Sequence, residues 1–344
     1  MNRSADAFSD ASGGDWSPPL AGLFGTGRSG STWLGAILNA HPDLAYRFEP
    51  LHRLRDHSRL EAIGRRLKAL DFTPDDVSQL YEALLPAHPA IDRPPFFSKN
   101  HAPTAGKHLA WTLARKFPLL SPAFEKIYSP RCRPPVLFKE VDLAPAVETL
   151  AQGTTVRLIY VVRHPVAVVD SLIRGQDRGV MPKERFKVLG NLLHERDSAL
   201  AGQWADRLDD ATDAQKNALL WRLEVEQAVA AMKNRPHAMI VVYEDLCRHP
   251  HQRAAEALDH LGLTMHDQVE QFIESSTHFN QAARRRHGEW FVDRYFTVFR
   301  DSARAADRWR QSVSADIQQQ VHDVVADGPA FQWLQQIGHW NPRD

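Results

Sequence analysis

A glycine-rich segment near the N-terminus constrains the fold of this chain more than any other feature of its sequence. Gly25-Thr-Gly-Arg-Ser-Gly-Ser-Thr32 follows a short apolar run at residues 20–24, which predicts a buried strand. It precedes residues 31–40, whose apolar side chains recur at helical spacing. Glycines let the backbone curl so that several N–H groups converge on one anion, and the helix behind adds its positive dipole end. This order predicts a phosphate-binding loop that opens an α/β domain.

The loop departs from the nucleoside-triphosphate pattern G-x-x-x-x-G-K-[ST] at one informative position. Gly25, Gly30 and Thr32 fit, but Ser31 stands where that pattern has the lysine that reaches the β- and γ-phosphates. Arg28 supplies a charge and a bidentate fork within the loop. The sequence therefore favours phosphate binding without a metal. A P-loop kinase that uses ATP is the alternative, a non-catalytic nucleotide-binding module is a third interpretation, and a plain glycine-serine turn is the simplest one.

The rest of the chain predicts a parallel sheet covered by helices on both faces. Apolar runs at 135–139, 156–162 and 237–243 read as further strands and alternate with helical patterns. Helices are expected near 58–70, 76–85, 183–209, 212–233, 251–261, 266–275 and 314–326. Prolines at 86, 89, 94, 95, 103, 118 and 122 predict loops over the rest of 55–130. We expect one domain at 20–344, with acceptor-site or lid insertions at 55–130 and 276–305, after a disordered tail at 1–19.

Composition narrows the class of protein further. Lys+Arg and Asp+Glu both number 42 among 344 residues, so no global field attracts nucleic acid or an anionic membrane. No apolar stretch is long enough to predict a membrane span, and the N-terminus lacks a secretory signal pattern. Cys132 and Cys247 are too few for a disulfide framework. We expect a cytoplasmic protein without a nucleic-acid or membrane partner; its oligomeric state is not predicted.

A second phosphate motif lies at the end of the third predicted strand. Arg163 follows that strand, where a kinase would have a magnesium-binding aspartate, and ligands of open α/β sheets bind at this end. A surface salt bridge is the competing interpretation for Arg163 considered alone.

Together these motifs resemble the sulfotransferase superfamily that uses 3′-phosphoadenosine-5′-phosphosulfate (PAPS). Its cytosolic members read K-S-G-T-T-W where this chain has Arg28-Ser-Gly-Ser-Thr-Trp33. The carbohydrate 6-O-sulfotransferase branch is more similar, with R-[ST]-G-[ST]-[ST] followed by H/N-P-D and F-E-P, matched here by His41-Pro-Asp43 and Phe48-Glu-Pro50. The resemblance implies a P-loop-like fold and metal-free transfer of a sulfuryl group from PAPS to a hydroxyl of a small molecule or glycan, with adenosine 3′,5′-bisphosphate (PAP) as product.

The resemblance also implies a set of nucleotide-binding residues. Trp33 would stack on adenine, although a core tryptophan is the competing interpretation, and Tyr243 would lie against the adenosine. Arg163 and Ser171 would bind the 3′-phosphate, and a C-terminal segment would close over the nucleotide. The full set is Gly27, Arg28, Ser29, Gly30, Ser31, Thr32, Trp33, Arg163, Ser171, Tyr243, Arg308, Trp309 and Arg310.

The expected catalytic residues are Arg28, Lys139 and Glu49. Arg28 and Lys139 would stabilise the charge that develops on the leaving phosphate. Cytosolic members have a histidine base two residues after the strand lysine, but this chain has Val141 there. The carbohydrate branch suggests Glu49 instead, with a pKa raised toward neutrality in a partly apolar cleft.

Two other candidate bases are less favoured. Glu140 is the runner-up, but strand alternation points it away from the face of Lys139. His101, in Lys99-Asn-His101, echoes the cytosolic K-T-H motif at the wrong place in the chain, and we interpret it as a decoy or an acceptor-pocket residue. The other histidines lack metal-ligand spacing, so no metal site is predicted.

Overall fold

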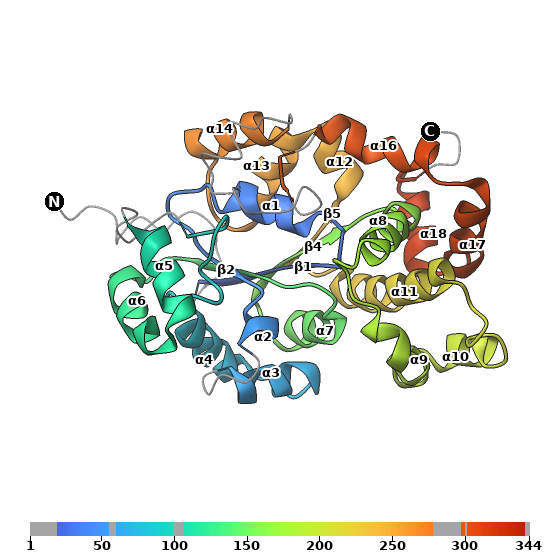
Figure 1. Ribbon diagram of the computed structural model, residues 1–344, viewed down its shortest axis with the longest axis horizontal. Coiled ribbons are helices and arrows are strands. Elements are labelled where there is room, and N and C mark those ends of the chain that lie inside the picture. Colours follow the sequence, from blue (N-terminus) through green and yellow to red (C-terminus); the bar gives the residue numbers. More distant parts are fainter. Residues whose placement is uncertain (1–18, 55–59, 99–105, 278–296, 300, 341–344) are drawn as a thin grey trace.

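Five parallel strands form the centre of the protein. The structure is a computed structural model that describes residues 19–54, 60–98, 106–277, 297–299 and 301–340. The strand order is β2-β3-β1-β4-β5, and every neighbouring pair is parallel (Figure 1). The strands are β1 (Leu20–Gly25), β2 (Ala45–Phe48), β3 (Val136–Lys139), β4 (Arg157–Val162) and β5 (Ala238–Val242). The predicted parallel α/β sheet is confirmed.

Helices cover both faces of this sheet, and the strands alternate between two hydrophobic clusters. Leu158 and Tyr160 point into one cluster, whereas Ile159 and Val161 point into the other. The first cluster is covered by α7 (Ala144–Gly153), α8 (Pro165–Asp177), α11 (Asp213–Met232), α17 (Ala315–Val325) and α18 (Pro329–Gln336). The second is covered by α1 (Ser31–Leu38), α12 (Tyr243–Arg248), α13 (Pro250–His260) and α14 (Asp267–Ser276) (Figure 1).

Strand β2 was not expected from the sequence, and it determines where Glu49 lies. It pairs with β3 so that Phe48 lies beside Lys139, and the Glu49 N–H donates to the Lys139 carbonyl at 2.8 Å. Its four residues include Arg47, whose charge obscured the strand pattern. The Arg47 guanidinium is buried and donates to the carbonyls of Leu84 at 2.7 Å and Tyr46 at 2.9 Å.

The segment between β2 and β3 is more helical than its prolines suggested. It contains α2 (Pro50–Arg53), α3 (Glu61–Lys68), α4 (Pro74–Leu84), α5 (Lys107–Lys116), the 3₁₀ turn η1 (Pro118–Leu120) and α6 (Ser121–Tyr128). The expectation of loops over 107–128 is wrong, because Pro118 and Pro122 occupy first-turn positions, where proline is tolerated. Ala114, Phe124 and Tyr128 form a small core of their own.

The predicted helix at 183–209 is divided into three pieces. These are η2 (Glu184–Val188), α9 (Leu189–Arg196) and α10 (Ser198–Trp204). Asp197 causes one break, because its side chain caps α10 by accepting from the Leu200 N–H at 2.9 Å. Helix α16 (Ser302–Ser312) precedes α17 in the chain. Within the described ranges, none of the helices has the length and apolar character needed to cross a bilayer. Of the expected tail at 1–19, only Pro19 is described.

Candidate active site

A cavity of about 610 Å³ lies at the carboxyl ends of the five strands. Parallel sheets bind ligands at this edge because the loops after the strands converge there. The cavity brings together predicted residues from well separated parts of the chain. They are Gly27, Arg28, Gly30, Ser31, Thr32, Trp33, Glu49, Lys139, Arg163 and Tyr243.

The loop after β1 adopts a conformation that requires glycine at one position. Gly30 has φ 98°, and a Cβ built on it would lie 2.2 Å from Cδ2 of Tyr243. Side chains are therefore excluded there both by backbone strain and by the tyrosine ring. The Ser29 N–H closes the turn by donating to the Thr26 carbonyl at 3.1 Å. Helix α1 begins at Ser31, so its positive dipole end faces the loop.

Arg28, Arg163 and Ser171 form one hydrogen-bonded group. Arg28 Nε donates to Ser171 Oγ at 3.0 Å, and Arg163 Nη1 donates to the Arg28 carbonyl at 3.1 Å. Ser171 does not line the cavity itself, and it lies behind Arg28 on α8. The two phosphate motifs that the sequence predicted therefore meet through Arg28.

Arg163 is held in position and retains unused donor capacity. Its Nη2 donates to the Ala305 carbonyl at 3.2 Å, and its guanidinium carbon lies 4.4 Å from the centre of the Tyr243 ring. Its Nε is buried and, among the described residues, has no hydrogen-bond partner. A buried donor without a partner is unfavourable, so this atom fits a bound anion such as a phosphate oxygen.

The position of Trp33 is compatible with both interpretations that the sequence left open, a core residue and a platform for adenine. It belongs to the hydrophobic cluster on the α1 side and is 7% exposed, yet it lines the cavity. Its Nε1 donates to Ser276 Oγ at 3.0 Å, and its ring meets Tyr243 edge to face, with centroids 6.3 Å apart. The ring is thus fixed in orientation beside the phosphate-binding loop, as a nucleobase platform requires.

Glu49 and Lys139 form an ion pair in the same cavity. Lys139 Nζ lies 2.7 Å from Glu49 Oε1, and Arg53 Nη2 lies 3.0 Å from Glu49 Oε2. The side chain of Lys139 is almost completely buried, and its Nζ lies 5.0 Å from the centre of the Phe48 ring. Glu49 has φ 51°, an unusual conformation for a residue with a side chain. Such backbone strain is concentrated at functional sites.

The electrostatics of Glu49 differ from the sequence expectation. Burial raises the pKa of the Glu49 carboxyl, as expected, but Lys139 and Arg53 outweigh burial and hold that pKa below its ordinary value. The expectation of a raised pKa is therefore wrong in this state of the site. No sequence pattern indicated that two cations would contact one carboxylate. Glu49 is consequently ionised at neutral pH and can accept a proton.

Glu140 points away from the cavity, as strand alternation predicted. Its carboxylate is buried, accepts from the Leu51 N–H, and lies 2.6 Å from His52 Nδ1. Burial raises the pKa of Glu140, and the hydrogen bond to Glu140 raises the pKa of His52. The two side chains hold α2 against β3, which supports a structural role for Glu140 and leaves Glu49 as the carboxylate in the cavity.

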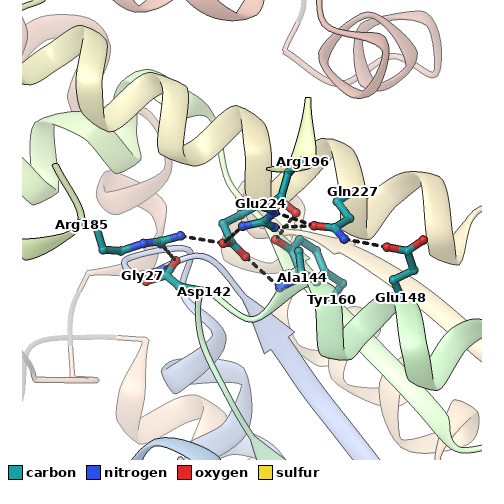
Figure 2. Close-up of polar contacts among 9 residues, drawn as sticks. All are labelled: Gly27, Asp142, Ala144, Glu148, Tyr160, Arg185, Arg196, Glu224 and Gln227. Carbon is teal, nitrogen blue, oxygen red and sulfur yellow. Dashed lines mark hydrogen bonds and ion pairs between the residues drawn. The ribbon is translucent and has the colours of Figure 1, made fainter. Parts of the chain in front are cut away.

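A polar network centred on the buried Glu224 supports the loop from behind (Figure 2). The Gly27 N–H donates to Asp142 Oδ1 at 2.9 Å, and Asp142 lies 3.4 Å from Arg185 Nη1. Arg185 and Arg196 both contact Glu224 Oε1, at 2.7 and 2.8 Å. Burial of Glu224 opposes ionisation, but these arginines outweigh it and lower its pKa.

The network connects distant elements. The second oxygen of Glu224 accepts from the Ala144 N–H at 2.8 Å, at the start of α7. Helix α11, which carries Glu224, is thereby joined to the β3–α7 connection and, through Asp142, to the phosphate-binding loop (Figure 2). None of these supporting residues was singled out from the sequence, because an isolated Asp or Glu carries no motif.

Some predicted site residues lie elsewhere. Ser29 is fully buried beneath the loop. Arg308 is exposed, Trp309 stacks on His164 with centroids 4.0 Å apart, and Arg310 contacts Asp307. The 308–310 segment packs against the C-terminal region and not into the cavity, so the geometry does not support its predicted nucleotide contact. His101 lies outside the described residues.

Other cavity residues were missed by sequence reasoning. Arg53 and Arg93 line the cavity beside Glu49, together with Phe48 and Phe96. Burial and the nearby Arg53 and Arg115 lower the pKa of Arg93 to about 10. Arg53, Arg93 and Phe96 come from the stretch after β2, which matches no motif, whereas Phe48 ends β2 and belongs to the Phe48-Glu-Pro50 motif. Over the described ranges, no group of three or more His, Cys, Asp or Glu side chains could hold a metal.

The fold and the cavity define a P-loop-like α/β protein with a cavity lined by Arg28, Lys139 and Arg163. A profile of the sulfotransferase domain family matches residues 140–338, more than half of the chain. The chain therefore belongs to the sulfotransferase family, and it is an enzyme of that type.

Curated relatives confirm the resemblance to the carbohydrate branch. The chain is 26% identical to carbohydrate sulfotransferase 1 of Danio rerio, over 86% of this chain and 73% of that protein. It is 25% identical to carbohydrate sulfotransferase 1 of Mus musculus, over 92% of this chain and 78% of that protein.

Solved structures with related chains are more distant. The sulfotransferase domain from the curacin biosynthetic pathway has a TM-score of 0.48 at 13% identity, covering 94% of this chain and 99% of that domain. Retinol dehydratase in complex with androsterone and inactive cofactor PAP has a TM-score of 0.44 at 14% identity, covering 95% of this chain and 84% of that chain.

Proposed function

We propose that this enzyme transfers a sulfuryl group from PAPS to a hydroxyl of a carbohydrate or glycosylated acceptor. The observation that carries the proposal is the placement of the Lys139–Glu49 pair in the same cavity as the cationic group formed by Arg28 and Arg163. One part of the cavity can hold phosphate, and the other presents a carboxylate and a buried ammonium group. The carbohydrate acceptor is suggested by the similarity to carbohydrate sulfotransferase 1.

The residues around the loop suit the donor. Loop and helix N–H groups with Arg28 would bind the 5′ phosphosulfate arm, and Arg163 Nε is a buried donor for the 3′-phosphate. Trp33 and Tyr243 offer aromatic surface for the adenine and the adenosine. The donor supplies an activated sulfuryl group whose bond to the 5′-phosphate breaks when an acceptor oxygen attacks sulfur.

Lys139 and Glu49 have different roles in the transfer step. Glu49 takes the acceptor hydroxyl proton as the new S–O bond forms, and Lys139 and Arg28 stabilise the charge left on the phosphate oxygen. Lys139 lowers the pKa of Glu49 more than any other neighbour. Any movement of its ammonium group toward the leaving phosphate would therefore raise that pKa and make Glu49 a stronger base. Positioning of both substrates in one cavity supplies the rest.

The acceptor would occupy the part of the cavity beyond Glu49. Phe48 and Phe96 stack there with ring centroids 4.9 Å apart, which offers a flat apolar surface for the face of a sugar ring. Arg53 and Arg93 add donors for acceptor oxygens. We also propose a cytoplasmic location, which the low number of cysteines supports, since Cys132 and Cys247 are too few for a disulfide framework.

Calorimetry with PAP and Mg-ATP tests the donor. PAP should bind the folded protein without magnesium, whereas preferential binding of Mg-ATP would favour a kinase and overturn the proposal. An acceptor screen with labelled PAPS then tests the reaction, since each product should gain the mass of one sulfuryl group.

A further inference from the structure

The hairpin formed by α5, η1 and α6 exposes an unusual number of large apolar side chains. Most of the exposed large hydrophobic side chains in the described parts of the chain belong to this one segment. We call this set the apolar tip. It consists of Leu109 (65% exposed), Leu113 (41%), Phe117 (49%), Leu119 (94%), Leu120 (42%) and Ile127 (53%). Clustered exposed apolar surface of this kind marks an interaction site more often than scattered single residues do.

Packing within the hairpin does not account for the apolar tip. The inner face is already occupied by Ala114, Phe124 and Tyr128, which are buried against one another. Leu109, Leu113 and Phe117 follow at intervals of four residues, so they form a stripe on the outer side of α5. The stripe continues into η1, where Leu119 is almost fully exposed. The exposed apolar side chains therefore project outward from α5, η1 and α6.

The charges around the apolar tip are mostly positive. Arg115, Lys116, Lys126 and Arg131 are all exposed, and in the part of the chain that the structure describes none of them has an ion pair. Glu125 is the one acidic residue between positions 106 and 131, and it is only partly exposed. The zero net charge of the whole chain had led to the expectation of no membrane partner. The hairpin is locally basic and apolar, although the net charge of the whole chain is zero.

We propose that the apolar tip inserts into the headgroup region of a lipid surface that contains anionic lipids. Leucine and phenylalanine side chains flanked by lysine and arginine are the combination that binds such an interface. A second copy of this chain is a poorer occupant, because a symmetric contact would place the basic flanks against each other. A projecting turn also inserts between lipids more readily than it forms the flat, packed centre of a protein interface.

The position of the hairpin brings the apolar tip close to the acceptor part of the cavity. This one point rests on the proposed sulfuryl transfer. Arg115 on α5 is close enough to Arg93 to lower its pKa, and Arg93 lines the acceptor part of the cavity. Helices α5 and α6 lie at the end of the molecule beside β2 (Figure 1). Docking through the apolar tip would hold the acceptor part of the cavity near the lipid surface, which suits an acceptor carried by a lipid.

Vesicle sedimentation tests the docking without any need for an acceptor. The full chain is mixed with vesicles of phosphatidylcholine and phosphatidylglycerol, or of phosphatidylcholine alone, and the pelleted fraction is measured. We expect binding to the mixed vesicles that weakens as salt is added. Leu119→Asp should lower the vesicle affinity about tenfold or more. Ile337→Asp is the matched control, because Ile337 is 50% exposed and gains the same charge far along the chain.

Each alternative gives a distinct result. Wild-type protein that stays in the supernatant with mixed vesicles, or equal losses for Leu119→Asp and Ile337→Asp, overturns the proposal. Light scattering that shows a dimer broken by Leu119→Asp, with no vesicle binding, assigns the apolar tip to self-association and also overturns it. PAP binding by calorimetry should be the same in all variants. Loss of vesicle binding with intact PAP binding therefore leaves the proposed sulfuryl transfer standing.

Discussion

Lys139 Nζ and Glu49 Oε1 lie 2.7 Å apart at the ends of two adjacent strands. The pairing of β2 with β3 places Phe48 beside Lys139, so Glu49 follows directly at the cavity wall. The sequence had suggested both residues separately, 90 positions apart. Because of this contact, the Lys139 ammonium group lowers the pKa of the Glu49 carboxyl.

Replacing Glu49 by glutamine should remove the proton acceptor. Glu49→Gln keeps the size of the side chain, so PAP affinity by calorimetry should stay close to that of the wild type. Turnover with labelled PAPS should fall about 10²- to 10⁴-fold, the usual contribution of a general base. Glu140→Gln is the companion variant. A large loss of turnover at Glu140 with wild-type turnover at Glu49 would reverse the assignment.

The pKa of Glu49 makes a prediction for pH dependence. Its folded-state pKa lies below the ordinary 4.5, so the ionised form predominates at pH 4.5 and above. The acid limb of kcat/KM due to Glu49 should therefore lie below pH 4.5, and the ion pair should stabilise the fold down to that range and lose its contribution as pH falls further. Lys139→Met should move the limb upward. An unmoved limb would show that Lys139 does not control this carboxyl.

Arg163→Ala should distinguish two nucleotides. PAP carries a 3′-phosphate and adenosine 5′-phosphate does not, so loss of the arginine should weaken PAP about 10- to 100-fold, the value of a charged hydrogen bond. Binding of adenosine 5′-phosphate should change far less. Isothermal calorimetry measures both constants, and equal losses for the two ligands would remove Arg163 from the 3′-phosphate site.

Gly30→Ala should disrupt the loop through a clash as well as through strain. The new Cβ would lie 2.2 Å from the Tyr243 ring in a backbone conformation with φ 98°. Gly179→Ala is a matched control, since Gly179 has φ 67° with open space around its Cβ position. Strain alone costs about 1–2 kcal/mol, so both variants should lose that much in denaturant unfolding. Only Gly30→Ala should also lose PAP affinity, and intact affinity would show that the tyrosine ring moves aside without cost.

Arg93→Gln should affect the acceptor more than the donor. Arg93 lines the cavity beyond Glu49, whereas Arg115 does not line it. We expect the KM for the best acceptor found in the screen to rise about tenfold, with little change in the KM for PAPS. Arg115→Gln serves as the control variant. An equal rise in both KM values would place Arg93 at the donor instead.

The sequence could predict what depends on local pattern. The strand–loop–helix order placed Gly27, Arg28 and residues 30–33 at the cavity, and the strand-end rule placed Arg163 there. Alternation along β3 correctly separated Lys139 from Glu140. Each of these arguments needs only near neighbours in the chain, which is why it worked without a structure.

The parts that failed depend on contacts between distant segments. Strand β2 was missed because Arg47 is buried by hydrogen bonds to α4, and no local pattern shows that. The pKa of Glu49 was predicted in the wrong direction because Arg53 and Lys139 approach it from two elements. Asp142 and Glu224 support the loop through partners on other helices.

The hydrogen bonds of Arg163 have a consequence for how nucleotides exchange. Both terminal nitrogens of its guanidinium already donate to backbone carbonyls, at Arg28 and Ala305. An incoming phosphate must either use the remaining Nε or compete with the chain for the other donors. The measured affinity then reflects the bonds that the phosphate forms with Arg163 minus the bonds to the two backbone carbonyls that it displaces. Because Ala305 belongs to α16, a phosphate that displaces this bond would couple nucleotide binding and release to the contacts of that C-terminal helix.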